Sequence, residues 1–335
     1  MSLTKQQSDT SAHDLDSQLV QRLADGGFHS GEQLGLEFGV SRATIHNHIE
    51  KLTTLGLDIF RVTGKGYRLA KPIQLLSSDK VRIKLPHELR ELPLYLNHVT
   101  GSTNDDIRSI ITNGTTPGTS VLAEMQTHGR GRRGKQWHSP FGSNLYLSIY
   151  WPLLQGLNAA MGLSVALGLA VAESLTAAGI QEVSVKWPND VYIQRKKVAG
   201  ILVELEGQAG GEGQAIIGIG LNLAMQDTEA SIDQPYTSVM AHLDKPLDRN
   251  WWASELIKRC IDRLTVHDQQ NLKGLLDVWR EYDHFYQQPV RLILGQHEQI
   301  GVGKGIDEFG ALLVQQSDGL KRYFGGEISV RNATT

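Results

Sequence analysis

The pattern of hydrophobic and polar positions changes twice along the chain, which predicts three folded units. Apolar residues first recur at helical spacing in a short segment, then fill alternating strand-like and helical runs, and finally form short strands between glycine turns. We therefore divide the chain into a disordered arm at residues 1–13, folded units at 14–70, 80–270 and 271–335, and a linker at 71–79.

The first unit carries three predicted helices. Apolar residues keep one helical face between positions 15 and 23. Ser30 begins a second helix with a capping box, because Gln33 stands three positions later. Ser41 caps a third helix, which Gly56 ends. Two short helices joined through a glycine are typical of a helix-turn-helix.

A basic hairpin follows these helices, with strands at 59–62 and 67–69 and a turn that carries Lys65. The segment 41–68 holds five cations and two anions in a protein of net charge −3, so its positive charge is local. A winged helix-turn-helix that binds DNA is the preferred interpretation, and a helical bundle for protein contacts is the alternative. The residues expected to face DNA are Ser41, Arg42, Thr44, His46, Asn47, His48, Lys51 and Lys65.

The middle unit alternates strand-like and helical runs, which is an α+β or α/β pattern. Pro86 and Pro93 predict an irregular approach to it. Strands are predicted at 120–123, 145–151, 183–187, 198–206 and 215–223, and helices at 103–113, 157–178 and 249–265. The last unit has short strands at 290–294, 299–305, 312–314 and 327–330, which predict a small barrel.

Composition is ordinary for a soluble globular protein, with 40% hydrophobic and 21% charged residues. The single cysteine, Cys260, excludes an internal disulfide and fits a reducing compartment such as the cytoplasm. The apolar run at 157–178 invites a membrane interpretation, but Asn158, Ser164 and Glu173 interrupt it. We expect a buried helix there and no membrane association.

The loop at 129–135 reads Gly-Arg-Gly-Arg-Arg-Gly-Lys and is suited to an anionic ligand. Glycine allows close backbone approach, and arginine binds carboxylate or phosphate oxygens in pairs. The spacing also satisfies a loose P-loop pattern, but Gln136 stands where Mg²⁺ needs a hydroxyl, and a strand follows instead of a helix.

Other polar groups stand at the ends of predicted strands. Ser102, Thr103 and Asn104 follow a strand-like run and could satisfy a polar head group, although a helix cap explains them equally well. Asp190 closes the segment Lys-Trp-Pro-Asn-Asp and could hold Mg²⁺, although this is also turn chemistry. Lys197 stands at the start of a strand, where a lone lysine is usually solvated.

Taken together, these motifs resemble one family. Segments 129–134, 186–190, 197–204 and 218–222 occur in the order found in biotin–protein ligases, and the first unit makes the chain similar to the bifunctional ligases that also repress biotin synthesis. The resemblance covers nearly the whole chain; the family loop often ends Gly-Arg, where this one has Gly134-Lys135. It implies a class-II-synthetase-like ligase domain and an SH3-like C-terminal barrel.

The resemblance also implies the reaction and its partners. Biotin and ATP would form biotinyl-5′-AMP, with Mg²⁺, and the biotin would pass to a lysine of the biotin carboxyl carrier protein. The adenylate would also be the corepressor of a homodimer on operator DNA, since palindromic sites need a two-fold protein.

The resemblance assigns site residues as follows. Biotin would be held by Ser102, Thr103, Asn104, Gln126, Arg130, Gly131, Arg132 and Lys197, of which Lys197 and Arg132 would be catalytic. ATP and the adenylate would be held by Arg132, Arg133, Trp137, Lys186, Asn189, Asp190 and Asn222, with Asp190 as the Mg²⁺ ligand.

Three alternatives stay open at this point. A lipoate or octanoate ligase would share the middle fold, although the arginine-glycine loop argues against it. A ligand-sensing transcription factor without catalysis would not need two cations at a phosphate. A ligase whose helix-turn-helix no longer binds DNA is compatible with the sequence.

Overall fold

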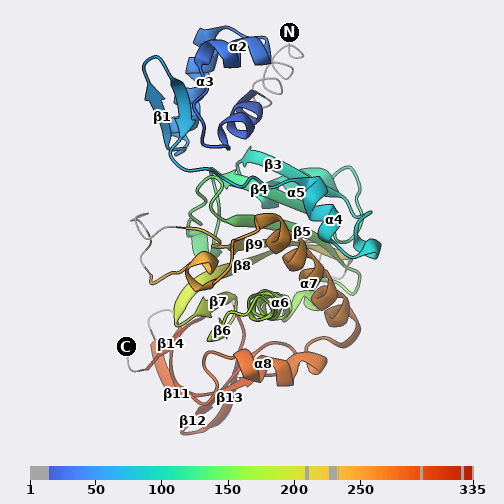
Figure 1. Cartoon of the computed structure of the whole chain (residues 1–335). Helices are drawn as coiled ribbons and strands as arrows, with labels where there is room; N and C mark the ends of the chain where they lie inside the picture. Colours follow the sequence, from blue (N-terminus) through green and yellow to red (C-terminus); the bar gives the residue numbers. More distant parts are fainter. Residues whose placement is uncertain are drawn as a thin grey trace.

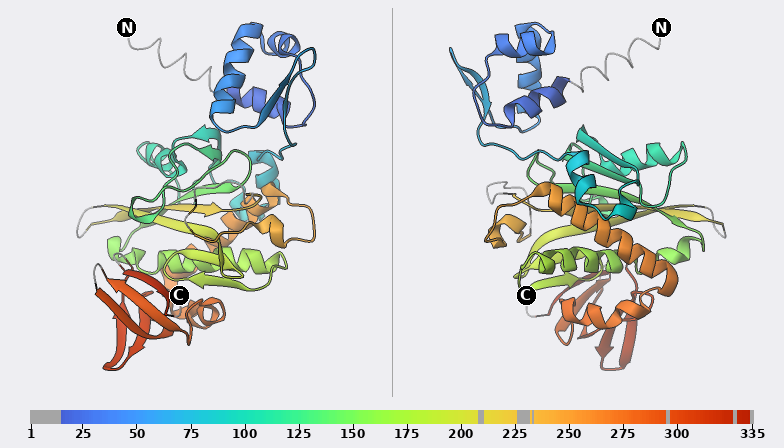
Figure 2. Two further views of the ribbon diagram at one scale, coloured as in Figure 1. Left: turned by 90° about the vertical axis from the view of Figure 1, so that its left-hand side faces the viewer. Right: turned by 45° about the vertical axis from the view of Figure 1, so that its right-hand side comes forward.

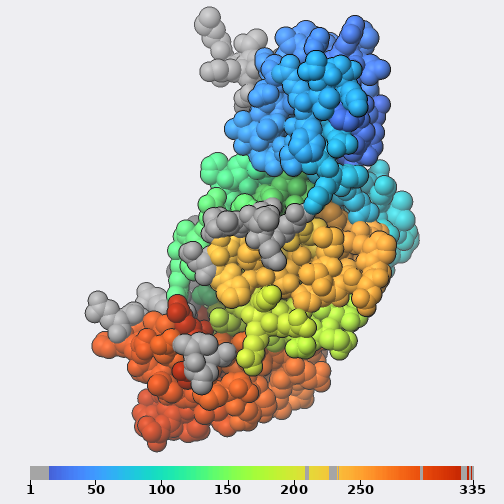
Figure 3. Space-filling view, turned by 60° about the vertical axis from the view of Figure 1, so that its left-hand side comes forward, coloured from blue at the N-terminus to red at the C-terminus, as the bar shows by residue number. Residues whose placement is uncertain are grey.

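The computed structural model describes residues 15–207, 211–225, 232, 234–294, 297–325 and 328–333. The chain forms an elongated row of units, with the N-terminal unit at one end and the C-terminal sheet at the other (Figure 1). A space-filling view shows the same order along one face (Figure 3). The predicted arm at 1–13 lies outside the described residues.

The N-terminal unit is a winged helix-turn-helix, as predicted. Ser30 makes both bonds of the capping box, and Ser41 Oγ accepts from Thr44 N. Leu19, Leu34 and Ile45 come from the three helices and are almost completely buried in one core. Its elements are a helix at 15–23, α2 Gly31–Phe38, α3 Arg42–Thr54, β1 Ile59–Val62 and β2 Gly66–Leu69.

The approach to the middle unit is more ordered than predicted. A helix, α4 Ser78–Lys84, begins within the expected linker, and a short 3₁₀ helix, η1 His87–Leu89, follows it. Ser77 caps α4, and Val81 is its one buried residue. So short a helix with a single buried position has no visible period in the sequence, which explains why it was missed.

The linker itself is bound to the middle unit. Arg249 donates to the backbone oxygen of Gln74 at 2.8 Å and to Glu124 Oε2 at 2.6 Å. Glu124 Oε1 accepts the backbone N–H of Leu76, and Asn250 Oδ1 accepts that of Ser77. The Arg249–Glu124 pair is buried, and these bonds partner both oxygens of the Glu124 carboxylate.

The middle unit is a seven-stranded sheet with helices on both faces (Figure 2). Only β3 and β4 are parallel, so the unit is α+β and not α/β. The strands, in sheet order, are β3 Leu94–Thr100, β4 Ser120–Gln126, β5 Leu145–Leu153, β9 Gly213–Leu221, β8 Lys196–Gly207, β7 Asp190–Ile193 and β6 Val183–Lys186. The strands β4, β5, β6, β8 and β9 confirm the predictions, whereas β7 was missed because it is only four residues long.

The two faces of this sheet differ. Ile107 of α5 Thr103–Ile111 packs on β4 and β9 in a small cluster. The opposite face carries α6 Leu163–Ala177 and α7 Arg249–Gln270 and holds the main core. The site described below lies on the α5 face, so the larger core supports it from behind.

The apolar run at 157–177 is long and apolar enough, by composition, to cross a membrane. In the structure it is divided into η3 Leu157–Ala160 and α6, with Gly162 in the left-handed region between them. Most of α6 is buried against the sheet, α7 and α8. The prediction of a buried helix is confirmed.

The C-terminal unit is a five-stranded antiparallel sheet in the order β13-β12-β11-β10-β14. Helix α8 Leu276–Tyr282 leads into it after the short η5 Lys273–Leu275. Its strands are β10 Pro289–Leu294, β11 His297–Ile306, β12 Leu312–Gln316, β13 Gly319–Tyr323 and β14 Ile328–Asn332. The small β unit is confirmed, and β13 was missed because its sequence is mostly polar. Part of the predicted strand 327–330 lies outside the described residues.

Candidate functional site

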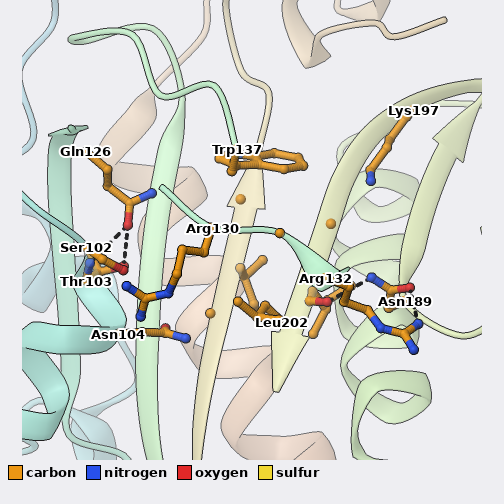
Figure 4. A pocket seen from close by; sticks show the side chains of 16 residues that line it. Ser102, Thr103, Asn104, Gln126, Arg130, Arg132, Trp137, Asn189, Lys197 and Leu202 are labelled. Carbon is orange, nitrogen blue, oxygen red and sulfur yellow. Dashed lines mark hydrogen bonds between the residues drawn. The ribbon is translucent and has the colours of Figure 1, made fainter. Parts of the chain in front are cut away.

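A cleft on the α5 face gathers most of the residues that the sequence singled out (Figure 4). Predicted residues that line it are Ser102, Thr103, Asn104, Gln126, Arg130, Gly131, Arg132, Trp137, Asn189 and Lys197. Its floor comes from β8 and β9, through Gly200, Leu202, Gly218 and Gly220. One end of the cleft holds neutral polar groups, flanked by Arg130, and the other holds Lys197 and Arg132.

The neutral end is anchored by Gln126 at the end of β4. Gln126 Oε1 accepts the backbone N–H of Thr103 at 3.0 Å and lies 3.1 Å from its hydroxyl oxygen. Gln126 Nε2 donates to Ser139 Oγ, which in turn donates to the carbonyl of Trp137. Ser102 occupies the N-cap position of α5, but its side chain makes no capping bond. A helix cap therefore does not account for its hydroxyl.

Ser148, a residue that the sequence analysis missed, lies beneath this end. It stands on β5, is completely buried, and its Oγ lies 2.7 Å from Thr103 Oγ1 and 2.5 Å from Asn104 Oδ1. Asn104 packs over Gly218, where a Cβ would lie 2.7 Å from its Oδ1. A serine inside an apolar strand belongs to no motif. Only the alternation of side chains between the two faces of the strand could have indicated that Ser148 points toward the cleft.

Arg130 of the glycine-arginine loop is bound by carboxylates. It donates to both oxygens of Asp105 at 2.6 and 2.7 Å and reaches Glu204 at 3.4 Å. These hydrogen bonds to Asp105 raise the pKa of Arg130 above its usual value. The Arg130 guanidinium therefore closes one side of the cleft through contacts within the protein.

Trp137 lies across the cleft over two paired glycines. Gly200 and Gly220 face each other on β8 and β9, and a Cβ on Gly200 would lie 3.0 Å from the indole ring. A Cβ on Gly220 would overlap the ring. Lys197 Nζ lies 5.3 Å from the ring centroid. The bare strands thus accept a flat aromatic group.

The charged end centres on Lys197 and Asp190. Their Nζ and Oδ1 atoms lie 2.7 Å apart, and their side chains are 13% and 21% exposed. Arg132 donates to Asn189 Oδ1 at 2.9 Å, and burial lowers the pKa of Arg132, with the charge of Arg133 adding to the effect. These groups form a cationic end with one internal carboxylate.

Lys186 lies behind this end. Lys186 lies opposite Asp190 in the antiparallel pair of β6 and β7, and its Nζ lies 3.4 Å from Tyr192 Oη. Burial lowers the pKa of Lys186; Asp190 opposes this, while Lys197 and Arg331 add to it. Several cations in one half-buried place favour an anionic ligand.

Besides Lys186 and Asp190, which lie behind the charged end, two other predicted residues do not line the cleft. Asn222 is buried below it and donates to the carbonyl of Thr237. Arg133 lines a neighbouring groove instead, with a φ of 59° in the left-handed region. No helix follows the loop: Gln136 bridges to Arg130, and β5 comes next, so a P-loop is not formed.

A metal site made by the protein alone is absent from the described part of the chain, where no three His, Cys, Asp or Glu side chains gather suitably. Asp190 offers one carboxylate beside the cations. Mg²⁺ commonly takes one or two carboxylates together with substrate phosphates, so this donor set fits Mg²⁺ only when a polyphosphate shares it.

The predicted DNA-binding surface is largely exposed. Arg42, Asn47 and Lys65 are open to solvent. Ser41 and Thr44 are engaged in the cap of α3, and His46 lies 3.4 Å from Tyr67 Oη.

Asp16 binds two residues of α3, and one of them, His48, corrects the prediction. His48 turns toward helix 15–23, where its Nδ1 lies 2.6 Å from Asp16 Oδ1, and its side chain is 16% exposed. Lys51 donates to the other oxygen of Asp16 at 2.6 Å. The expectation that His48 faces outward is wrong, because it lies one turn from the buried Ile45 and Leu52 and shares their side of the helix.

Comparison with known proteins supports this picture in each unit. The chain matches an HTH domain model at residues 16–68, the biotin/lipoate A/B protein ligase family at 97–222, and the biotin protein ligase C terminal domain at 287–331. Among solved structures, a biotin protein ligase from Aquifex aeolicus in complex with biotin and ATP is 29% identical, with a TM-score of 0.61, and the match covers 72% of this chain and 99% of that one.

Other relatives match this chain over nearly its whole length, including the helix-turn-helix unit. The bifunctional ligase/repressor BirA of Salmonella typhimurium is 45% identical over 94% of this chain and 97% of its own length. The protein of the same name from Escherichia coli is 44% identical over the same shares, and the one from Bacillus subtilis is 30% identical. The chain therefore belongs to the family of bifunctional biotin ligase/repressor proteins.

Proposed function

We propose that this chain joins biotin to ATP, forming biotinyl-5′-AMP and pyrophosphate, and then transfers the biotin to a lysine of a biotin carboxyl carrier protein. The observation that carries this proposal is the cleft, which places a neutral polar end beside a cationic end. Biotin has two parts that complement these ends: a neutral, polar cyclic urea and an anionic carboxylate. The lipoate or octanoate alternative would place an apolar tail against the polar groups at Thr103 and Gln126, where it makes no hydrogen bond.

In the first step, Lys197 would stand between the biotin carboxylate and the ATP α-phosphate. Attack of one anion on the other concentrates negative charge, and a fixed ammonium stabilises that charge in a partly buried place. Asp190 Oδ1 lies 2.7 Å from Lys197 Nζ and balances its charge. The phosphate would then replace or share this partner.

Arg132 and Trp137 would retain the adenylate. Trp137 offers a flat surface beside the bare Gly200 and Gly220 for an adenine ring. Arg132 would bind phosphate oxygens, and the loop would exclude water from a mixed anhydride that water destroys. The second step needs only the carrier's lysine amine as nucleophile.

Asp190 would hold Mg²⁺ together with the ATP phosphates, with Lys186 nearby to bind them. A bound Mg²⁺ would add charge neutralisation to that of the cations. Lys186 and Arg132 supply fixed positive charge whether or not the ion is present.

The same chain would repress biotin synthesis by binding operator DNA. α3 and the wing would contact the DNA through Arg42, Asn47 and Lys65. The adenylate would serve as corepressor by favouring a homodimer. Both partners belong to the cytoplasm, which suits the buried, unbridged Cys260.

Substrate choice tests the enzymatic half. Purified protein is incubated with ATP and biotin, lipoate or octanoate, and pyrophosphate release and retained adenylate are measured, the latter by mass spectrometry. We expect turnover and a retained adenylate with biotin alone. Turnover with lipoate or octanoate at a comparable kcat/KM would overturn the assignment.

DNA binding tests the repressor half. Arg42→Ala with Lys65→Ala should weaken operator binding and reduce the salt slope by ~1 per lost phosphate contact. Arg22→Ala is the control, because Arg22 pairs with Asp25 and Glu37 away from α3. Gel shifts across salt concentrations, with and without biotin and ATP, measure both quantities. If operator affinity does not depend on biotin and ATP, or if the double variant binds like the parent, the repressor half of the proposal is wrong and the ligase half stands.

A further inference from the structure

One face of the hairpin formed by β6 and β7 carries four polar side chains. Ser184 and Lys186 flank the buried Val185 on β6. Their cross-strand partners on β7 are Tyr192 and Asp190, respectively. Because side chains two residues apart share one face of a strand, Lys186 and Asp190 share their face with Ser184 and Tyr192.

Tyr192 is the aromatic neighbour of Lys186 on this face. The Lys186 Nζ atom lies 3.4 Å from Tyr192 Oη and 5.3 Å from the centroid of the phenol ring. Tyr192 is only 8% exposed, so the groups packed around it fix the position of its ring. A ring fixed beside a long, flexible lysine side chain limits where the ammonium can lie.

His284, which follows α8, packs on the Tyr192 ring. The two ring centroids lie 5.3 Å apart, with an angle of 31° between the ring planes. The backbone N–H of His284 donates to Val185 O at 3.0 Å, and its Nδ1 lies 3.0 Å from Ser184 Oγ. The buried Phe285 meets the imidazole at an angle of 80°. These contacts hold the imidazole against Tyr192.

His284 forms a neutral wall between Tyr192 and a hollow on the outside of the hairpin. Burial lowers the pKa of His284 to about 4, and the charges of Lys186 and Arg195 add to the effect. The imidazole therefore carries no charge at neutral pH and does not repel Lys186. Ser184 and His284 line the outer hollow, which has a volume of about 250 Å³, whereas Tyr192 and Lys186 do not line it.

We propose that His284 is a positioning residue for ATP binding, which acts through Tyr192 to hold Lys186 at the charged end of the cleft. The inference rests on the proposed function, in which Lys186 binds the ATP phosphates. The neutral end of the cleft is built from α5, β4 and β5, so biotin binding should not depend on His284.

Removing the imidazole should weaken ATP binding and leave biotin binding unchanged. His284→Ala leaves a space beside Tyr192, so that Tyr192 and Lys186 can shift. We expect KM for ATP to rise ~10-fold, the scale of one weakened bond to a charged group, while kcat and KM for biotin change less than ~2-fold. His284→Phe keeps a ring against Tyr192 and should restore most of the affinity for ATP. Pyrophosphate release at varied ATP and biotin concentrations measures all three constants.

A double-mutant cycle tests whether His284 acts through Lys186. Lys186→Gln should raise KM for ATP by itself. If His284 only positions Lys186, adding His284→Ala to Lys186→Gln should raise KM for ATP no further. Two independent effects would add in free energy, so a further rise of ~10-fold in the double variant would contradict the inference.

His267→Ala is the matched control for lost stability. His267 is also a buried histidine, and its Nε2 donates to the backbone oxygen of Met161. This variant should lower the melting temperature and leave KM for ATP unchanged. Thermal melting also verifies that the His284 variants fold. If His284→Ala does not fold, His284→Gln replaces it, because glutamine can keep a bond to Ser184 but has no ring.

Three outcomes would overturn the inference: an unchanged KM for ATP in the variant that lacks the ring, an equal rise of KM for biotin, or no restoration by His284→Phe. If the parent protein does not activate biotin at all, the proposed function fails and the inference fails with it.

Discussion

At one end of the cleft the polar groups are neutral, buried and bonded to each other, whereas at the other end they are charged and one carboxylate balances the cations. Thr103, Asn104 and Ser148 are each less than 5% exposed and have their partners already. Lys197 forms an ion pair with Asp190, a group that a phosphate could replace. The neutral end is therefore held by bonds within the protein, whereas the charged end would exchange an internal partner for the proposed substrate.

The largest effect should come from breaking the charged end at Lys197. Lys197→Gln removes a charge-assisted contact made in the transition state, so pyrophosphate release at saturating substrates should slow by ~10²–10³-fold. Lys196→Gln, one position earlier and exposed, is the control. If Lys197→Gln turns over at the parent rate, the charged end does not stabilise the reaction.

A smaller effect should follow from loosening the loop at Arg132. Arg132→Gly removes the bond to Asn189 and any contact with the adenylate, so the intermediate should escape ~10- to 100-fold faster. Adenylation should persist, and lysines of unrelated proteins in a mixture should become biotinylated. Lys135→Gly is the control: it removes an exposed cation from the same loop. This variant should biotinylate the carrier protein only. Labelling confined to the carrier with Arg132→Gly would show that the loop does not retain the intermediate.

The smallest effect distinguishes the two ends by pH. Burial lowers the pKa of Lys186, so it loses its proton below the usual 10.5 as pH rises, and kcat/KM for ATP should fall early on the alkaline side. Lys186→Arg should move that fall to higher pH, because guanidinium stays protonated. Ser148→Ala, at the neutral end, should leave it in place. If the fall of kcat/KM at high pH stays at the same pH in Lys186→Arg, a group other than Lys186 causes it.

The same shift has a consequence for stability. A lysine whose pKa is lower in the folded state binds fewer protons there than in the unfolded chain between the two values. The free energy of unfolding contributed by Lys186 should therefore rise with pH in that range.

Local signals predicted much of this molecule. Capping residues such as Ser30 and Ser41 bond neighbours in the sequence, so their helices could be recognised directly. The glycine-arginine loop and Lys197 were recognised by composition and by resemblance. What the sequence could not predict are contacts between distant strands and helices, such as Ser148 with Asn104 or His48 with Asp16. These depend on register and helix packing, which carry no local mark.

The linker bonded to Arg249 and Glu124 also limits how the protein can read DNA. Ile73 N donates to Ala24 O in the winged helix, and the carbonyl of the next residue, Gln74, already accepts from Arg249 in the ligase unit. Adjacent linker residues are thus bonded to different units, which would restrict rotation of α3 relative to the ligase unit. A pair of such chains would tolerate little change in operator spacing. Moving one half-site by five base pairs, roughly half a helical turn, would turn it away from the second recognition helix.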